Sequence, residues 1–195
     1  MVVPAMPATK QRSTREAILD RAVDLASEEG LESLTIGRLA AELEMSKSGL
    51  FGNFGSKQDL QVATVEAAAK RFADEVVAPA LSEPSGLKRL RALCDGYIGH
   101  LEREVFSGGC FWGSVTAEFD DRPGPVRDRI GEGMAAWIGA LEREAEKAGA
   151  DDPSQVAFEL IAVAQAANTR SRLFGDRQAF AHARAAIDRL LSPLG

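Results

Sequence analysis

The stretch from residue 35 to residue 60 constrains the fold more than any other part of the chain. Its apolar residues recur at spacings of three and four, which predicts two short helices, residues 35–43 and 47–53, each buried along one face. Thr35 and Ser46 are residue types that cap helix N-termini. Two short helices joined by a tight turn form a helix-turn-helix, whose second helix is suited to the major groove of DNA. The predicted buried positions are Ile36, Leu39, Ala40, Leu43, Leu50 and Phe54.

The rest of the chain repeats the helical period between clear interruptions. Ser13 with Glu16 has the spacing of a capping box, and Gly30 follows the first helix. Ser56 with Asp59 has the same spacing at the start of a long helix. Alanine is abundant and β-branched residues are sparse, which favours helix over strand. The further predicted helices are residues 13–29, 57–77, 87–106, 110–119, 126–148, 154–174 and 178–191.

These nine helices predict an all-α protein with two parts. Residues 10–56 form an N-terminal three-helix domain that contains the helix-turn-helix, and residues 57–195 form a C-terminal helical domain. Residues 1–10 have two prolines and little pattern, so we interpret them as a flexible arm. A contact of Lys10 or Arg12 with DNA is the alternative role for this end of the chain.

Charge and composition narrow the class of protein. The formal net charge of −6 argues against a protein that coats nucleic acid without regard to sequence. The stretch from Ser46 to Gln58 nevertheless holds two lysines and no acid, which suits site-specific binding. No segment approaches the roughly 18–20 apolar residues of a membrane helix, and we see no signal peptide. Cys94 and Cys110 do not make a disulfide framework, so we expect a cytoplasmic protein with no membrane partner.

No arrangement of residues predicts an enzyme. The chain has two histidines, His100 and His182, and no Cys/His cluster, so we expect no metal site. No glycine-rich loop follows a strand, so we expect no nucleotide cofactor, and indeed no cofactor of any kind. A helical enzyme and a helical protein-interaction module are the alternatives from other classes.

The segment SKSGLFGNFGSKQDL resembles the signature of TetR-family transcriptional regulators, roughly S-K-x-x-L-Y-x-H-F-x-x-K-x-x-L. Two positions depart from it: Phe51 stands where the family usually has Tyr, and Asn53 where it usually has His. Phe51 lacks the hydroxyl that would reach a phosphate, so we expect a modified grip on the DNA backbone. The matching residues are Ser46, Lys47, Leu50, Phe54, Lys57 and Leu60.

The resemblance implies a homodimeric, ligand-responsive regulator, typically a repressor that a small-molecule effector releases from a palindromic double-stranded DNA operator. The positions that match the family's DNA contacts lie on and around the second helix of the helix-turn-helix. The expected DNA-binding residues are Thr35, Ser46, Lys47, Ser48, Gly49, Phe51, Gly52, Asn53 and Lys57.

Aromatic residues gather on the middle helices, where the resemblance implies an effector cavity. A small apolar or aromatic effector fits such a lining, and ordinary core packing is the alternative. The candidate lining residues are Tyr97, His100, Phe106, Phe111, Trp112, Met134, Trp137, Phe158, Gln165 and Asn168.

The helix over residues 154–174 is apolar around most of its circumference, so it needs burial on two sides. One side can be the core and the other a partner subunit, as the resemblance implies for the last two helices. The alternative is a helix central to one monomer. The candidate interface residues are Ala157, Leu160, Ala164, Ala167, Ile187 and Leu190.

Cys110 offers an alternative mode of regulation. It follows two glycines at a predicted helix start, where the pKa of a thiol falls. The second hypothesis is therefore a regulator whose DNA binding responds to oxidation of Cys110 and not to a small-molecule effector.

Overall fold

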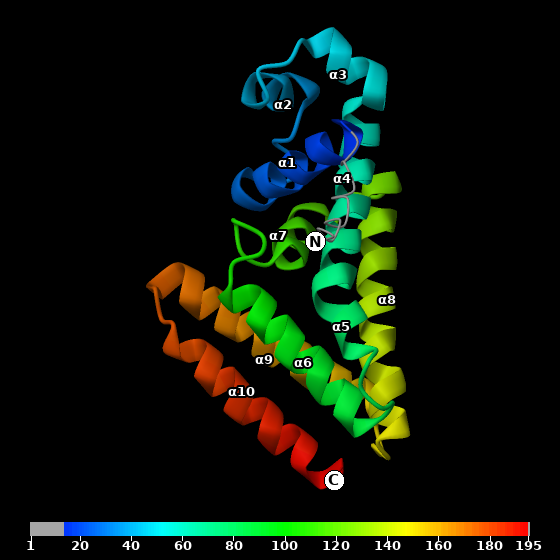
Figure 1. Ribbon diagram of the computed structural model, residues 1–195, viewed down its shortest axis with the longest axis vertical. Helices are drawn as coiled ribbons and strands as arrows, with labels where there is room; N and C mark the ends of the chain where they lie inside the picture. The colour runs from blue at the N-terminus through cyan, green and yellow to red at the C-terminus, as the bar shows by residue number, and fades with distance from the viewer. Residues whose placement is uncertain (1–13, 195) are drawn as a thin grey trace, which may run out of the picture.

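The computed structural model describes residues 14–194, and this range is helical with no strand. The predicted all-α fold is confirmed (Figure 1). The α-helices are α1 (Thr14–Glu29), α2 (Ile36–Glu42), α3 (Lys47–Phe54), α4 (Lys57–Phe72), α5 (Ala78–Ala80), α6 (Leu87–Glu102), α7 (Phe111–Phe119), α8 (Pro125–Lys147), α9 (Pro153–Phe174) and α10 (Gln178–Leu191), with a π-helical turn, η1 (Ala73–Val77), between α4 and α5 and a 3-10 turn, η2 (Ser192–Leu194), after α10. The predicted arm and the predicted cap at Ser13 lie outside the described residues.

The structure corrects two predicted helix ends. The helix predicted for residues 57–77 reaches Ala80, because η1 and α5 continue α4 and Pro79 is accommodated in the last turn. The helix predicted for residues 87–106 ends at Glu102. Glu104 there takes a φ of 54°, in the left-handed region, which turns the chain out of the helix and leaves Phe106 in the following loop.

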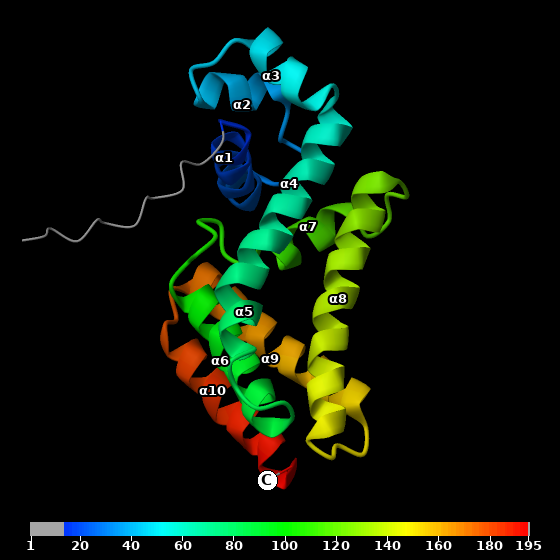
Figure 2. The same ribbon diagram turned by 45° about the vertical axis from the view of Figure 1, so that its right-hand side comes forward.

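The molecule is elongated, with α2 and α3 at one end and the C-terminus at the other (Figure 1). We call α1, α2 and α3 the head, and α6 to α10 the body. α4 packs against α1 of the head and against α8 of the body, and its continuation packs against α6. Figure 2 shows α4 running from the head into the body. One helix therefore belongs to both parts.

The body is a stack of helices in which α9 packs most extensively on α10 and also on α8 and α6. A single apolar core runs through head and body, from Leu25 and Leu39 to Phe106, Phe111 and Phe180, all nearly or fully buried. Within residues 14–194, no helix is both long enough and apolar enough to cross a membrane.

Candidate nucleic-acid interface

The helix α3 presents most of its residues to solvent at the tip of the head. Leu50 and Phe54 are its buried side chains and fix it to the core. Every other residue of α3 is exposed, including Phe51 at 57%. An exposed helix held by a buried stripe at the end of an elongated molecule has the form of a recognition helix. The predicted DNA-binding residues that it exposes are Lys47, Ser48, Gly49, Phe51, Gly52 and Asn53.

The two predicted N-caps are present. The Thr35 Oγ1 accepts the Arg38 N–H at 3.0 Å, and the Ser46 Oγ accepts the Gly49 N–H at 3.2 Å. The Thr35 hydroxyl keeps its own O–H as a donor for a phosphate oxygen, whereas the Ser46 Oγ also lies 3.3 Å from the Ser48 Oγ, and either of these two hydroxyls can be the donor. The Asn53 side-chain amide is turned back on its own helix, where Nδ2 donates to the Gly49 carbonyl at 2.8 Å. This bond uses one of the two N–H groups of the amide, so the second N–H can still donate to DNA.

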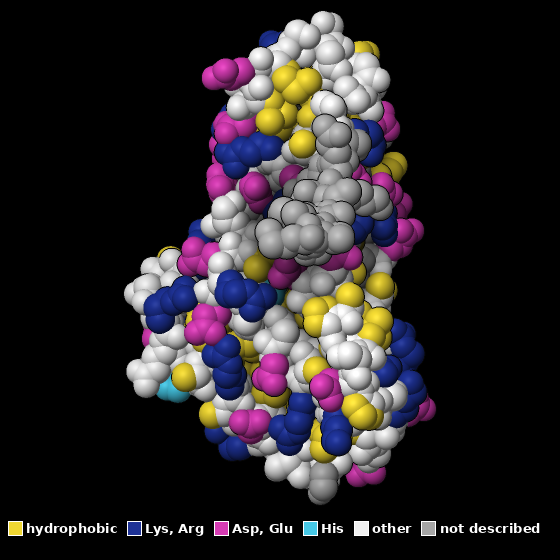
Figure 3. All heavy atoms as spheres, in the orientation of Figure 1, with side chains coloured by type: hydrophobic (Ala, Val, Ile, Leu, Met, Phe, Trp, Pro, Cys, Tyr) yellow, Lys and Arg dark blue, Asp and Glu magenta, His cyan; other side chains and the backbone are white. Residues whose placement is uncertain are grey.

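Three cationic side chains surround α3. Lys47 is exposed, and Lys57 at the start of α4 forms an ion pair with Glu32, with Nζ 2.9 Å from Oε1. The Arg15 guanidinium of α1 lies over the Phe54 ring, 5.2 Å from its centroid. Arg15 was not among the predicted DNA contacts, because only the folded structure brings it next to Phe54 of α3. Figure 3 shows acidic and basic side chains interspersed over one face of the molecule.

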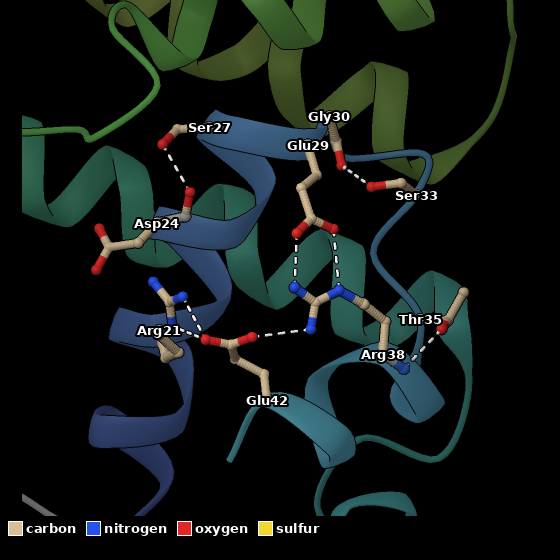
Figure 4. A network of polar contacts seen from close by, with 9 residues as sticks. All are labelled: Arg21, Asp24, Ser27, Glu29, Gly30, Ser33, Thr35, Arg38 and Glu42. Carbon is tan, nitrogen blue, oxygen red and sulfur yellow. Dashed lines mark hydrogen bonds and ion pairs between the residues drawn. The ribbon is translucent and has the colours of Figure 1, made fainter.

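A polar network holds α2 on α1 (Figure 4). Arg38 of α2 donates to both carboxylate oxygens of Glu29 at 2.6 and 3.0 Å, and to Glu42 at 2.9 Å. Arg21 of α1 also pairs with Glu42. The Arg21 and Arg38 guanidinium groups therefore hold the pKa of Glu42 below its usual value, and Arg38 does the same for Glu29. The network keeps α2, and the turn to α3 behind it, in a fixed orientation.

The head also contacts the body through α7. The Glu118 carboxylate accepts the N–H groups of Leu31 at 3.1 Å and Glu32 at 2.8 Å, in the turn that follows α1. In the loop before α7, the Gly108 N–H donates to Ser27 Oγ at 3.0 Å. A Cβ on Gly108 would lie 1.6 Å from the Ser27 carbonyl oxygen, so only glycine fits there.

A third contact joins α4 to both parts. The Arg71 guanidinium donates to the Asp24 carboxylate at 2.6 Å and to the Asp20 carbonyl at 3.0 Å, both on α1. Its other neighbour is the Phe106 ring of the body, 5.5 Å away. The recognition helix is thus linked to the body through α4, α7 and Arg71.

Two family descriptions match the chain. Residues 18–64 match the bacterial regulatory proteins of the tetR family, and residues 86–187 match the tetracyclin repressor-like C-terminal domain. The second match alone covers more than half of the chain. The chain belongs to the TetR family. It is a DNA-binding transcriptional regulator, and dimerisation and a response to ligands are typical of its family.

Solved TetR-family structures share the fold. SCO4454 from Streptomyces coelicolor has a TM-score of 0.81 at 21% identity over 92% of this chain and 89% of its own. A regulator from Legionella pneumophila has a TM-score of 0.81 at 20% identity over 93% and 98%. AibR, in complex with isovaleryl coenzyme A and operator DNA, has a TM-score of 0.71 at 20% identity over 90% and 96%. No curated protein matches the chain.

In this TetR-family chain, six of the ten predicted effector-pocket residues form a buried aromatic cluster. Their rings contact one another edge to face or tilted, with Phe72 of α4 between α6 and α8. Gln165 adjoins this cluster, since its Nε2 donates to the Tyr97 hydroxyl at 2.8 Å. Asn168 accepts the Cys110 N–H at 3.3 Å. The six are Tyr97, His100, Phe106, Phe111, Trp112 and Trp137.

The last two predicted pocket residues, Phe158 and Met134, lie outside the aromatic cluster. Phe158 is 68% exposed on the outer side of α9, so its assignment to an internal pocket is wrong. Met134 lies in a separate cleft between α7 and α8. The spacing of apolar residues on α9 did not reveal which side of that helix faces the core.

His100 is buried inside the aromatic cluster at 2% exposure, and neither ring nitrogen has a hydrogen-bond partner among the described residues. Burial, together with the charges of Arg103 and Arg71, lowers its pKa from 6.5 to about 4. The folded protein therefore holds His100 neutral at neutral pH.

We expect this burial to make stability depend on pH. The unfolded chain binds a proton at His100 below about pH 6.5 and the folded chain only below about pH 4, so stability falls between these values, by about 3 kcal/mol in all. His100→Leu should remove this loss. Thermal unfolding at pH 7.5 and pH 5 measures it, and equal losses in the two proteins would contradict the prediction. Glu29 and Glu42, which lose their contribution at lower pH, are present in both proteins.

Both thiols of this TetR-family chain are buried. Burial raises the pKa of Cys94 to about 12. Cys110 caps α7 as predicted, but its sulfur accepts hydrogen bonds from Gln165 and the Gly113 N–H and is 5% exposed. A redox sensor needs an accessible thiolate, so the structure does not support the alternative based on Cys110.

The predicted dimer-interface residues lie inside the subunit. Five of them are between 0 and 5% exposed where α9 packs on α10, α8 and α6, and Leu190 is half-buried. Side chains already covered within one subunit have little surface to offer a second, and the dimer interface itself stays a prediction. The five are Ala157, Leu160, Ala164, Ala167 and Ile187.

Proposed function

We propose that the chain is a ligand-responsive, sequence-specific repressor that acts in the cytoplasm and leaves a palindromic operator when a small apolar or aromatic effector binds. The observation that carries this proposal is the exposed helix α3, held at the tip of a head that is bonded to the body at several places. A ligand in the body then has a physical route to the head. The AibR structure, which contains an acyl coenzyme A and operator DNA together, supports this combination on the same fold.

We also propose that two copies associate through the outer sides of α9 and α10. Three of the five large apolar residues that are exposed in residues 14–194 lie on α9. They continue a stripe of small exposed residues at helical spacing, which lets two helices approach closely. Two heads on a two-fold axis would then read half-sites whose centres lie about one DNA turn, or a small multiple, apart. The exposed stripe is Phe158, Ala162, Ala166, Thr169 and Leu173, with Phe174 beside it.

The proposed switch is a change in the position of the heads. A ligand that binds the body shifts the DNA equilibrium only by the difference in its affinity for the two conformations. Such a ligand should therefore bind more weakly to the operator complex than to the free protein. α4, Glu118 and Arg71 are the elements that would carry the change.

We expect Lys47→Ala to weaken operator binding about fivefold and to lower the salt slope by about 1 for each head, because one phosphate contact is lost. Lys57→Ala should have a smaller effect, since Lys57 first gives up its ion pair with Glu32. Lys88→Ala, an exposed lysine of the body, is the control. Binding measured from 50 to 200 mM salt tests this, and an unchanged slope for Lys47→Ala would rule out its phosphate contact.

Selection of bound fragments from random double-stranded DNA tests the proposed function without a known operator. We expect a palindromic sequence with two half-sites. Recovery of no sequence above background would overturn the proposal and would favour a helix-turn-helix that packs against protein.

A further inference from the structure

A cleft of about 570 Å³ lies between α7 and the first half of α8. This volume is within the range of small-molecule sites. Its apolar surface comes from Phe119, Ile130 and Met134, and Gly131 leaves its middle open, with nothing within 4 Å of a Cβ placed there. The cleft is distinct from the buried aromatic cluster, although Trp112 packs against Gly133 one turn of α7 away.

The charged residues that line the cleft are mainly acidic. Asp120, Asp128 and Glu132 line it together with a single cation, Arg127. Glu132 is paired with Arg129 at 3.1 Å. The Asp120 and Asp128 carboxylates have no ion pair or hydrogen bond with any residue in the range 14–194.

The cations near the cleft are already engaged. Arg127 donates through Nε to the Asp120 carbonyl at 2.9 Å, and Arg129 is shared between Glu132 and Glu66. Arg122 lies over the Phe119 ring and pairs with Glu32 of the head at 3.5 Å. The cleft is thus lined by two carboxylates without an ion pair and by one guanidinium that is bonded to a backbone carbonyl, beside apolar side chains, and this lining complements a positively charged ligand.

Thr116 also lines this cleft, and its Oγ1 is buried without a hydrogen-bond partner among the described residues. A hydroxyl oxygen accepts a hydrogen bond from an ammonium group and is costly to leave unpaired. An ammonium group could pair with this oxygen only if binding exposed it.

We propose that the α7–α8 cleft binds a cationic amphiphile, a molecule with an apolar or aromatic body and a positive charge, and that it does not bind an anionic acyl compound. This inference rests on the proposed function, because it names the class of effector. The α7 wall of the cleft carries Glu118, which bonds to the Leu31 and Glu32 N–H groups of the head. A ligand that moves α7 therefore acts directly on the turn before α2.

Tetraphenylphosphonium and tetraphenylborate test the inference, because they share size and shape and differ in the sign of the charge. Calorimetric titration of the full chain without DNA should show binding of the phosphonium at least tenfold tighter than that of the borate. Asp128→Asn and Asp120→Asn should each weaken phosphonium binding about threefold, and Arg127→Gln should strengthen it. Asp151→Asn, an exposed acid at the far end of α8, should have no effect.

Gly131→Phe places a ring in the cleft without a backbone clash and should abolish phosphonium binding. Equal or tighter binding of the borate, no binding of the phosphonium, or unchanged binding by Gly131→Phe would each overturn the inference. A chain that selects DNA but fails this titration loses only the ligand class. A chain that binds the phosphonium in the cleft but selects no DNA loses the proposed function instead.

Discussion

Gly108→Ala should lower the free energy of unfolding by about 3 kcal/mol, a decrease of roughly 10 °C in Tm. The added Cβ would lie 1.6 Å from the Ser27 carbonyl oxygen and 2.0 Å from its carbon. Both are backbone atoms in the last turns of α1, so no side-chain rotation relieves the overlap. The α6–α7 loop must move away from the head, and the bond from the Gly108 N–H to Ser27 Oγ is lost with it.

Gly131→Ala is the matched control for this substitution. It places the same methyl group on an exposed turn of α8 with nothing within 4 Å, and alanine favours helix over glycine by up to about 1 kcal/mol. Urea unfolding followed by circular dichroism should show opposite changes for the two variants. A Gly108→Ala protein as stable as the original would mean that the head and the loop do not meet as described.

Phe158→Asp should convert the proposed dimer to a monomer and reduce operator affinity by about 100-fold or more. The side chain is 68% exposed in one subunit, so a carboxylate there costs the fold little. In the proposed interface it would be buried opposite its symmetry mate. Without the partner each head binds alone, and the gain from two linked heads, typically 10²–10⁴, disappears.

Leu81→Asp separates this effect from a general effect of adding charge. Leu81 is 57% exposed directly after α5, which packs on η1 and α6. We expect this variant to remain dimeric by light scattering and to bind the operator normally. If the Leu81→Asp protein dissociates and the Phe158→Asp protein does not, the interface lies near the end of α5 and not on α9.

The local structure was largely predictable because its causes are close in sequence. Caps such as Thr35 and Ser46 satisfy N–H groups within three residues of themselves, so their pattern marks where α2 and α3 begin. The buried stripe of α3, Leu50 and Phe54, follows from the helical period alone. The predicted bounds of the helix over residues 178–191 match α10.

The side of a helix that faces the core was not predictable in the same way. α9 is apolar on both sides, and Ala164 and Ala166 are equivalent to a sequence pattern. The structure buries Ala164 and exposes Ala166, because α10 and α6 arrive from one direction. For the same reason, the sequence pattern led us to assign Phe158 to the effector pocket, although its side chain is exposed. Only the three-dimensional arrangement of the neighbours distinguishes a core stripe from a surface stripe.

The contacts between head and body were also beyond prediction. Glu118 reaches Leu31, and Gly108 reaches Ser27, across more than 80 residues of sequence. A lone Glu on a helix or a glycine in a loop carries no sign of such a partner. The pair of glycines at positions 108 and 109 was interpreted as a helix break, and the requirement for close approach to α1 depends on the fold.

The Glu32 carboxylate pairs with two cations, one expected to bind DNA and one located next to the proposed ligand cleft. One carboxylate oxygen pairs with Lys57, a proposed phosphate contact, and the other lies 3.5 Å from Arg122, just after α7. When a phosphate takes Lys57, Arg122 is the cation that remains paired with Glu32, so the head is held more tightly to the body. By reciprocity, a change that draws Arg122 away leaves Lys57 more firmly bound to Glu32 and less available to DNA. Because all three side chains are exposed, each of these ion pairs contributes less than about 1 kcal/mol. The exchange of partners at Glu32 would therefore change operator affinity only slightly.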